Sequence, residues 1–383
     1  MRRLSQVAVA TALVLAACGG SPSSSRTYSS PSSPPAVTPG KTASPSTNAS
    51  PASTPGGTAL VHCSAPVPAG DNLVIGTVSG DTTILVRDIQ DPANAKNVCQ
   101  FDSAAVNPTF VSAAQVAYET AANQLIKADV ASGTSTVLAT FGAGFGSGQY
   151  SFSPDGRSVT YLDGDKWYLV TASGSRVLST LPAVPGRGTN QDEDDLFLSF
   201  SPDGQYIALV QTFRTGGSGA TAPDQVRKAS DGSLVYSTSG MTMAVWASLP
   251  SRLYFRDAGG TVRRWDPSSG LSSMLPLRWI RPKASPDGRW IAYTFRSSSG
   301  LGGIGFYSVQ SNSVSNTTPP GRSGARFLTN DLVWYIGERA CSTCFGGQPA
   351  PTGATYIYEI AGATEVVARL SSVLDAWPHS TAP

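Results

Sequence analysis

Histidine is scarce in this sequence. Among 383 residues there are only two, His62 and His379, and they lie towards opposite ends of the chain. A Ser-His-Asp triad, or a metal site built from several histidines, would therefore have to draw on the chain ends. The sequence also lacks the G-x-S-x-G motif, the turn that presents the nucleophilic serine of α/β-hydrolases. Catalysis by these routes is disfavoured, whereas carboxylate chemistry, such as that of a lyase, stays open.

Charged residues are also few, at 14% of the chain, and the formal net charge is +2. A balance so close to neutral argues against a nucleic-acid partner and against a polybasic membrane-binding surface. No long segment has the hydrophobic period of a helix, while glycine (39 residues) and proline (28 residues) are abundant. Together these features predict an all-β domain with many turns.

The first 18 residues predict an export signal. Arg2 and Arg3 precede an apolar run, 7–17, that is too short to span a bilayer as a permanent helix. The run ends in Leu-Ala-Ala-Cys-Gly, which resembles the lipobox of bacterial lipoproteins, with Cys18 at the lipidated position. The resemblance implies cleavage before Cys18 and stable anchoring by its acyl chains. The alternative is an ordinary signal peptide with a chance cysteine.

Residues 19–58 are almost entirely Ser, Pro, Thr, Ala and Gly. Such a segment buries too little apolar surface to offset its ordering entropy, so we predict a disordered stalk. No second hydrophobic span follows it. We therefore predict that residues 59–383 form a soluble exported domain, held at the membrane by the lipid in the periplasm or at the cell surface.

The motif Ser-Pro-Asp-Gly occurs three times, each time between two alternating apolar segments. Proline presets φ, Asp bonds its own backbone, and Gly adopts the left-handed conformation, so the motif predicts a tight hairpin. The three copies lie in Tyr150–Leu162, Leu198–Val210 and Lys283–Phe295. Segments 108–119, 244–256 and 325–337 extend the series. Their spacing of roughly 40 to 48 residues is that of one four-stranded propeller blade.

A second series of turns supports this prediction. It comprises Ser132-Gly133, Ser173-Gly174, Asp231-Gly232, Ser269-Gly270, Ser311-Asn312 and Ala361-Gly362. If the first series joins strands a and b of each blade, the second joins strands c and d. A seventh blade would combine 72–77, 82–89 and 97–101 with strand a from 372–378. We therefore predict an all-β, seven-bladed propeller closed by N- and C-terminal strands, with six or eight blades as alternatives.

The run Ser-Phe-Ser-Pro-Asp-Gly followed by an apolar strand resembles the WD-repeat-like propeller modules of the TolB type. The likeness covers most of residues 59–383, and three blades carry the clear motif. It implies a propeller that acts in the cell envelope. The carboxylates of the motif, Asp155, Asp203 and Asp287, are predicted to form hairpins and not to act as catalytic acids.

Four cysteines follow Cys18, and in an exported protein they are expected to form disulfides, with three possible pairings. We favour Cys63 with Cys99, which would fasten the segment before the first blade to that blade's outer strand. Cys341 with Cys344 would then stiffen a glycine-rich loop. The alternative is a zinc site that uses all four thiols.

Two further patterns are not taken as ligand sites. Gly300–Gly305 satisfies G-x-G-x-x-G, but a strand follows it where a dinucleotide site needs a helix, so a hairpin loop is predicted. The acidic run 192–195 has the oxygen ligands that Ca²⁺ uses, but its spacing matches no calcium loop, so a solvated loop is predicted. We predict no metal and no cofactor.

Long insertions favour one face of the propeller. The b–c loops are long at 214–225, 296–305 and 338–354, and the acidic run precedes a strand a, so all belong to the same end of the blades. Functional residues concentrate on loops held by a rigid scaffold. We predict a recognition face that includes Asp192, Asp194, Arg214, Arg296, Arg339 and Phe345. The alternative is that these are merely tolerated insertions.

The predicted function is that of a lipid-anchored extracytoplasmic propeller that binds an unidentified envelope protein or glycan without catalysis. One alternative is a propeller enzyme, a lyase or a glycan-active protein, with carboxylates and arginines in a central pocket. Another is a purely structural component of the envelope.

Overall fold

The computed structural model describes residues 61–63, 73–77, 84–88, 97–101, 105–142, 150–181, 196–211, 223–247, 250–275, 277, 279–296, 300–341, 344, 349–368, 370 and 372–377. The chain divides into two compact units, 1–48 and 49–383, and every described residue belongs to the second. The predicted signal segment with Cys18 and the predicted stalk lie outside the described residues.

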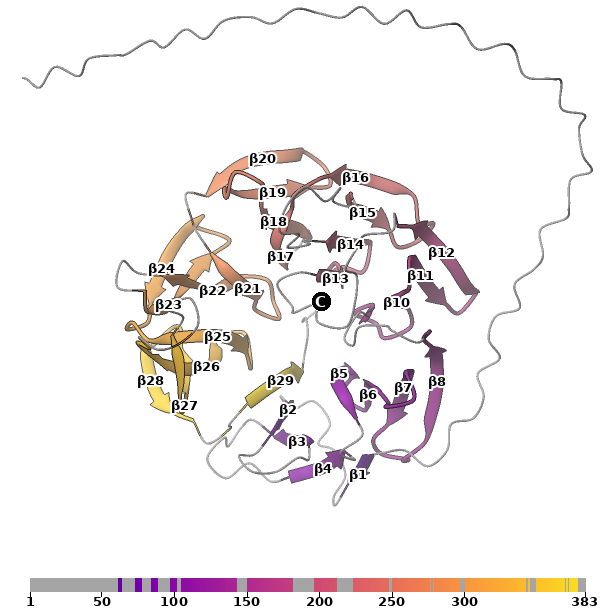
Figure 1. The fold of residues 1–383 in the computed structure, drawn as a ribbon, viewed down its shortest axis with the longest axis horizontal. Coiled ribbons are helices and arrows are strands. Elements are labelled where there is room, and N and C mark those ends of the chain that lie inside the picture. The colour runs from indigo at the N-terminus through magenta and orange to yellow at the C-terminus, as the bar shows by residue number, and fades with distance from the viewer. Residues whose placement is uncertain are drawn as a thin grey trace, which may run out of the picture. The chain divides into compact units, whose positions relative to one another are not determined.

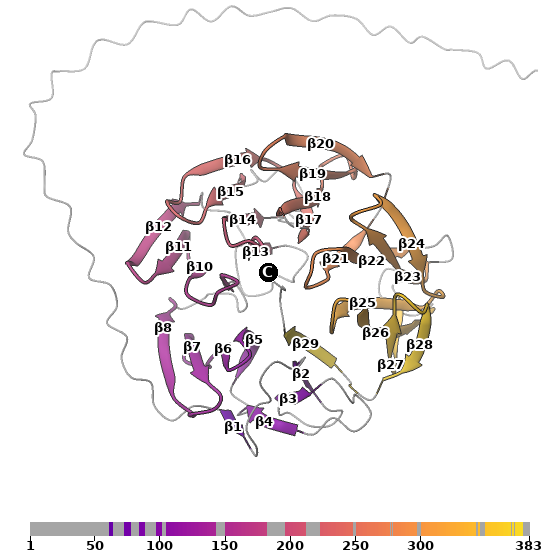
Figure 2. The ribbon, with the colours of Figure 1, turned by 180° about the vertical axis from the view of Figure 1, so that it is seen from behind.

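The second unit is an all-β propeller of seven antiparallel sheets that follow one another around an axis (Figure 1). Six sheets have four consecutive strands each, and we number them blades 1 to 6 in chain order. The seventh, which we name the closing blade, has five strands. The predicted number of blades is confirmed. In blades 1 to 6 the first strand lies nearest the axis and the last lies at the rim, as the view from behind also shows (Figure 2).

The strands have the following bounds. Blade 1 consists of β5 (Val106–Ser112), β6 (Gln115–Glu119), β7 (Gln124–Asp129) and β8 (Ser135–Thr140). Blade 2 consists of β9 (Tyr150–Phe152), β10 (Val159–Asp163), β11 (Lys166–Thr171) and β12 (Gly174–Thr180). Blade 3 consists of β13 (Leu196–Phe200), β14 (Tyr206–Gln211), β15 (Asp224–Lys228) and β16 (Leu234–Thr238). Blade 4 consists of β17 (Thr242–Ala247), β18 (Arg252–Arg256), β19 (Val262–Asp266) and β20 (Gly270–Leu275).

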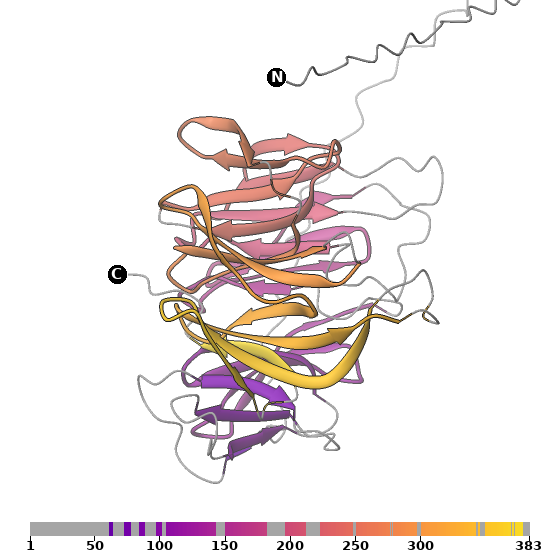
Figure 3. The same ribbon diagram turned by 90° about the vertical axis from the view of Figure 1, so that its left-hand side faces the viewer.

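Blade 5 consists of β21 (Ile280–Ala284), β22 (Trp290–Arg296), β23 (Gly302–Ser308) and β24 (Ser313–Thr317). Blade 6 consists of β25 (Arg322–Phe327), β26 (Leu332–Arg339), β27 (Ala350–Glu359) and β28 (Thr364–Val367). The closing blade, from the axis outwards, consists of β29 (Ser372–Trp377), β2 (Leu73–Thr77), β3 (Ile84–Asp88), β4 (Asn97–Phe101) and β1 (Val61–Cys63). Seen from the side, the strands run from one face of the ring to the other (Figure 3).

The closing blade joins the two ends of the described chain. Strand β29 pairs with β2, with Leu73 opposite Trp377 and Val74 opposite Ala376. This is the predicted pairing of N- and C-terminal segments, and it leaves the ring without an open radial gap between first and last blade. The fifth strand, β1, was not predicted as a strand. It pairs with the outer strand β4, where Cys63 lies directly opposite Cys99.

The three Ser-Pro-Asp-Gly turns share one hydrogen-bond pattern, as the turn from Ser201 to Gly204 shows. The Ser201 hydroxyl donates to Asp203 Oδ1 at 2.6 Å and accepts from the backbone N–H of Tyr206 at 2.9 Å. Gly204 has a φ of 69° and donates its N–H to the Ser201 carbonyl. The equivalent bonds recur in the other two copies. These serines and carboxylates are engaged in the hairpin itself, as the sequence predicts.

The hydrophobic core is divided among the seams between blades. Each of its seven clusters combines buried residues of two neighbouring blades. Tyr118 of blade 1, for example, packs with Phe101 of the closing blade, and the two ring centroids lie 5.9 Å apart. Because each blade buries both of its faces in this way, its second strand is buried almost throughout, as in β10 and β22, whereas outer strands such as β24 are largely exposed.

Candidate functional site

Two of the six residues predicted for the recognition face lie among the described residues. Arg296 is the last residue of β22 and Arg339 is the last residue of β26, so both stand where strand b ends, in adjacent blades. Both are exposed. The other four, Asp192, Asp194, Arg214 and Phe345, lie outside the described residues.

Two of the loops that carry this face are shorter than predicted, because the strands extend into them. Strand β23 begins at Gly302, so the glycines of the G-x-G-x-x-G match are mostly in a strand, and the predicted hairpin loop is reduced to 297–301. Strands β26 and β27 extend to Arg339 and back to Ala350, leaving 340–349. The glycines of β23 lie opposite aromatic residues of β22: Gly303 pairs with Phe295, and Gly305 pairs with Tyr293.

The inner strands place seven equivalent residues around the axis. In each blade one residue of strand a pairs with the corresponding residue of strand b, as Lys283 does with Ala292 and Arg326 with Trp334. We name this set the axial ring; it consists of Thr109, Ser151, Ser199, Val245, Lys283, Arg326 and Asp375. Its charged members are Lys283, Arg326 and Asp375, and they come from three consecutive blades: 5, 6 and the closing blade.

Asp375 links the closing blade to blade 1. Its Oδ2 accepts hydrogen bonds from Thr109 Oγ1 and from the backbone N–H of Phe110, each at 2.7 Å. The same position in blade 2 makes a similar link, because Ser151 Oγ accepts from the backbone N–H of Phe200 in blade 3 at 3.2 Å. The ring carboxylate is thus a structural acceptor between neighbouring inner strands.

Tyr150, at the start of β9, lies close enough to Asp375 of the axial ring to feel its charge. Its hydroxyl donates to the carbonyl of Asn107 at 2.5 Å. Burial raises the pKa of Tyr150, and the negative charges of Glu119 and Asp375 raise it further. The phenol therefore remains protonated at neutral pH and acts as a donor, not as a base.

Four inner strands contain a bulge whose central residue has a positive φ. These residues are Asn107 (47°), Met243 (51°), Arg281 (50°) and Gly324 (69°), and each stands two positions before its axial-ring residue. Three of the four are not glycine, and such a conformation is uncommon outside glycine. β-Bulges change the direction of side chains and are enriched near functional sites. In the sequence, these bulges were indicated only by the pairs Asn107-Pro108 and Arg281-Pro282, because proline within a sheet favours bulges.

Positive charge gathers on blades 5 and 6. Lys283 and Arg326 belong to the axial ring, and the exposed Arg281 lies at the bulge ahead of Lys283. Neighbouring strands are antiparallel, so the start of strand a lies at the same end of the blade as the end of strand b. Arg281 therefore belongs to the same face as Arg296 and Arg339. We name the five residues Arg281, Lys283, Arg296, Arg326 and Arg339 the basic sector.

One arginine of blade 6 is engaged within its own blade. Arg322 makes a two-point ion pair with Glu365, at 3.0 Å (Nε–Oε2) and 2.7 Å (Nη2–Oε1), and its guanidinium lies 3.9 Å above the centroid of the Tyr356 ring. The Tyr335 hydroxyl donates to the same carboxylate at 2.6 Å. Arg322, followed by the Tyr335 hydroxyl, lowers the pKa of Glu365. This network joins the innermost and outermost strands of the blade.

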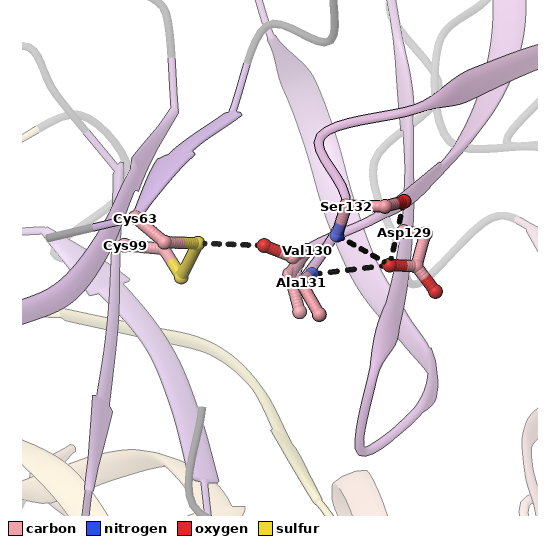
Figure 4. The surroundings of a disulfide bond; sticks show 6 residues. All are labelled: Cys63, Cys99, Asp129, Val130, Ala131 and Ser132. Carbon is pink, nitrogen blue, oxygen red and sulfur yellow. Dashed lines mark hydrogen bonds between the residues drawn. A yellow bond between two sulfur atoms is a disulfide. The ribbon is translucent and has the colours of Figure 1, made fainter. Parts of the chain in front are cut away.

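Two disulfides are present among the described residues: Cys63 with Cys99, and Cys341 with Cys344. The first holds β1 on the rim of the closing blade, and Cys63 Sγ lies 3.0 Å from the carbonyl oxygen of Val130 in blade 1 (Figure 4). That carbonyl belongs to a turn in which Asp129 Oδ1 accepts from the backbone N–H groups of Ala131 and Ser132. The second disulfide lies between β26 and β27, at the end of the blades where strands b end.

The described residues contain no group of three or more His, Cys, Asp or Glu side chains that would hold a metal ion. Within the same ranges, no helix is both long and apolar enough to cross a membrane.

Comparison with known proteins gives the fold. No family model matches the chain, and no curated protein matches its sequence. Among solved structures, it resembles the dihydro-heme d1 dehydrogenase NirN in complex with DHE, with a TM-score of 0.50, 15% identity, and coverage of 84% of this chain and 80% of that one. It also resembles an oligogalacturonate lyase in complex with manganese, with a TM-score of 0.50, 12% identity, and coverage of 77% and 83%.

TolB from Acinetobacter baumannii is a further similar structure, with a TM-score of 0.40 and 18% identity over 68% of this chain and 65% of that one. At these identities the likenesses bear on the fold alone. They agree with the β-propeller that the sheet order shows.

Proposed function

We propose that this protein is exported, is anchored to the membrane through lipid on Cys18, and binds an envelope protein or an acidic glycan without catalysis. The binding surface is the face of the propeller at which strands b end. The observation that carries this proposal is the basic sector, five cationic side chains contributed by two adjacent blades. Cations gathered on one part of a surface favour association with a partner that presents negative charge there.

The geometry of the axial ring supports binding rather than acid–base catalysis. General acid–base chemistry on a carboxylate pair needs two such groups near the reacting bond. The ring has one, Asp375, and one of its oxygens already accepts two hydrogen bonds from blade 1. The aspartates of the three motif turns are engaged in their own hairpins.

An enzyme remains the second candidate. The propellers of similar structure include a dehydrogenase and a lyase, which shows that the fold supports catalysis in other proteins. The specific observation in its favour is the succession Lys283, Arg326 and Asp375 in the axial ring, which brings cations and a carboxylate to the axis. A purely structural role in the envelope is the third candidate, and it requires no partner for the basic sector.

The disulfides support an extracytoplasmic location, since disulfides persist in oxidising compartments and are rare in the cytosol. Anchoring is tested by Cys18→Ser, which removes the thiol that would be acylated. We expect this variant to move from the membrane fraction to the soluble fraction. Retention of the variant at the membrane would contradict lipid anchoring at Cys18.

Partner binding is tested by in vivo crosslinking, affinity recovery and mass spectrometry of the full chain. The test variant is Arg281→Ala/Arg296→Ala/Arg339→Ala, and we expect it to recover the crosslinked partner at least tenfold less well. The matched control is Arg157→Ala/Lys228→Ala/Arg289→Ala, which removes three exposed cations from the opposite face. Equal recovery with both triple variants would refute the proposed face.

A further inference from the structure

Strand β28, at the rim of blade 6, is the outermost described strand of its sheet (Figure 1). Its two valines are the most exposed large apolar side chains among the described residues: Val366 is 58% exposed and Val367 is 75% exposed. Successive side chains of a strand point to opposite faces of the sheet. This half of β28 is therefore largely uncovered on both faces.

The corresponding strands of the other blades differ from β28 in one respect. In each of the other six blades the fourth strand from the axis contains one extra residue relative to the strand it pairs with, which makes a β-bulge. The extra residues are Val98, Leu138, Leu178, Val235, Met274 and Ser315. Bulges, lysines and prolines are means by which proteins keep a sheet edge from pairing with another chain. Strand β28, with the sequence Thr-Glu-Val-Val and no shift of register against β27, has none of the three.

The edge of β28 presents the backbone groups of Glu365 and Val367. Ala368, directly after the strand, donates its N–H to the carbonyl of Thr355 at 2.8 Å and so points towards β27. Backbone N–H and C=O groups alternate in direction along an antiparallel strand. Those of Val366 therefore also point towards β27, whereas those of Glu365 and Val367 point away from the sheet. No described strand lies beside them.

The rim of this propeller already accommodates an added strand. In the closing blade, β1 pairs antiparallel with the outer edge of β4 as a fifth strand. Blade 6 has the same four-stranded order up to β28, but the fifth position is empty among the described strands. An antiparallel strand beside β28 would therefore repeat an arrangement that the fold contains.

Charge indicates which strand fits there. The only charged side chain of β28 is Glu365, and its carboxylate is already bound by Arg322 and by the Tyr335 hydroxyl. A second β28, laid antiparallel about a two-fold axis at Val366, places Val366 opposite its own copy and Glu365 opposite Val367. No carboxylate then faces another, and each Glu365–Val367 pair can exchange both of its N–H···O bonds.

We infer that β28 pairs antiparallel with β28 of a second copy of this chain, about a two-fold axis at Val366. The two blades then form one continuous sheet across the dimer. Because both copies use the same surface, the contact closes after two chains. A contact confined to one pair of strands is small, so the dimer is transient and is detected by trapping. The inference depends neither on the recognition face nor on the lipid anchor proposed above.

The inference is tested by disulfide trapping of the purified full chain. Val366→Cys places two thiols opposite each other at the axis, so that mild oxidation links two copies. The matched control is Val314→Cys, on the outer strand of blade 5, where the side chain is 40% exposed but lies beside the bulge at Ser315. The native chain, with its own five cysteines, gives the background. We expect Val366→Cys to yield about tenfold more dimer than the control on a non-reducing gel, because strand pairing raises the effective thiol concentration.

A second substitution tests the backbone pairing. Val367→Pro, added to Val366→Cys, removes an N–H that points away from the native sheet, and we expect about tenfold less dimer with Tm close to that of Val366→Cys alone. Should proline lower Tm, Val367→Lys replaces it and places a charge at the edge without changing the backbone.

Three results would overturn the inference. The first is a dimer yield from Val366→Cys no greater than that from Val314→Cys. The second is a yield that neither Val367→Pro nor Val367→Lys reduces. The third comes from the same oxidation in intact cells: a link from position 366 to a different protein, and none to a second copy, would assign the edge to another occupant.

Discussion

Asp375 and Thr109 are separated by 266 positions in the sequence, yet Thr109 Oγ1 donates to Asp375 Oδ2 at 2.7 Å. The bond joins the innermost strand of the closing blade to the innermost strand of blade 1, and the backbone N–H of Phe110 donates to the same oxygen. Strand β29 thus completes the ring in two ways: it pairs with β2 in its own sheet, and it bonds to the next blade.

The first prediction concerns this closure. Asp375→Ala leaves two donors of blade 1 without their acceptor, and hydrogen bonds to a charged group contribute about 1.5–3 kcal/mol to stability. We expect a loss of about 2–4 kcal/mol in the free energy of unfolding, measured by urea denaturation. Asp331→Ala is the control, because the Asp331 side chain is 46% exposed and its ion pair with Arg289 is long, at 3.9 Å. A loss no greater than that of the control would show that β29 is held by sheet pairing alone.

The second prediction compares the two disulfides. A crosslink stabilises mainly by restricting the unfolded chain, and the effect grows with the length of the loop it closes. Cys63 and Cys99 are 36 positions apart, whereas Cys341 and Cys344 are 3 apart. Cys63→Ser/Cys99→Ser should therefore cost about 4 kcal/mol and Cys341→Ser/Cys344→Ser about 2 kcal/mol. Thermal unfolding of both double variants measures the difference, and the reverse order would contradict this explanation.

The third prediction concerns the glycines of β23. A Cβ added to Gly305 would lie 2.5 Å from Tyr293 Cζ, and Tyr293 is only 4% exposed. Gly305→Ala should therefore lower the free energy of unfolding by about 1–3 kcal/mol through overpacking. Gly142→Ala serves as the control, since its Cβ would meet only Asp163 Oδ1 at 3.4 Å. In a double-mutant cycle with Tyr293→Leu, the loss of unfolding free energy in the double variant should be smaller than the sum of the losses in the two single variants. Simple additivity would rule out the clash.

The fourth prediction concerns pH. Arg322 and the Tyr335 hydroxyl lower the pKa of Glu365 from its usual 4.5, so the folded state favours the charged form. The stability that this carboxylate contributes is present above the unfolded-state pKa and is lost as pH falls through the lower folded-state pKa. The difference in unfolding free energy between the native chain and Glu365→Gln should therefore shrink as pH is lowered from about 7 to about 3. A difference that stays constant over this range would contradict a lowered pKa of Glu365 in the folded state. The control is Glu359→Gln, at an exposed position of the neighbouring strand.

The sequence predicted those features of the structure that a few successive residues specify by themselves. The Ser-Pro-Asp-Gly turns were predictable because four successive residues specify the backbone conformation and its hydrogen bonds. From six such turn pairs, the blade count and the closure by residues 372–378 followed. Strand β1 was missed because three residues are too few to show a strand period, although Cys63 indicated where the segment would be fastened.

The features around the axis could not be predicted in the same way. The conformation of Met243 is imposed by how neighbouring inner strands fit together, as the 3.5 Å contact from the backbone N–H of Arg281 to Met243 Sδ illustrates. Likewise, Gly303 and Gly305 read as a loop in the sequence, because nothing local showed that Phe295 and Tyr293 would lie across them. The axial ring appears only when the registers of seven sheets are compared.

The central claim is that a partner binds the face that carries Arg296 and Arg339. The most direct test is site-specific photocrosslinking in living cells, with a photoreactive amino acid placed singly at position 296 or 339 and, as a control, at 157 or 289 on the opposite face. We predict that a discrete crosslinked species forms from positions 296 and 339 and is absent from 157 and 289. A partner captured only from 157 or 289, or no crosslink from 296 and 339, would contradict the claim.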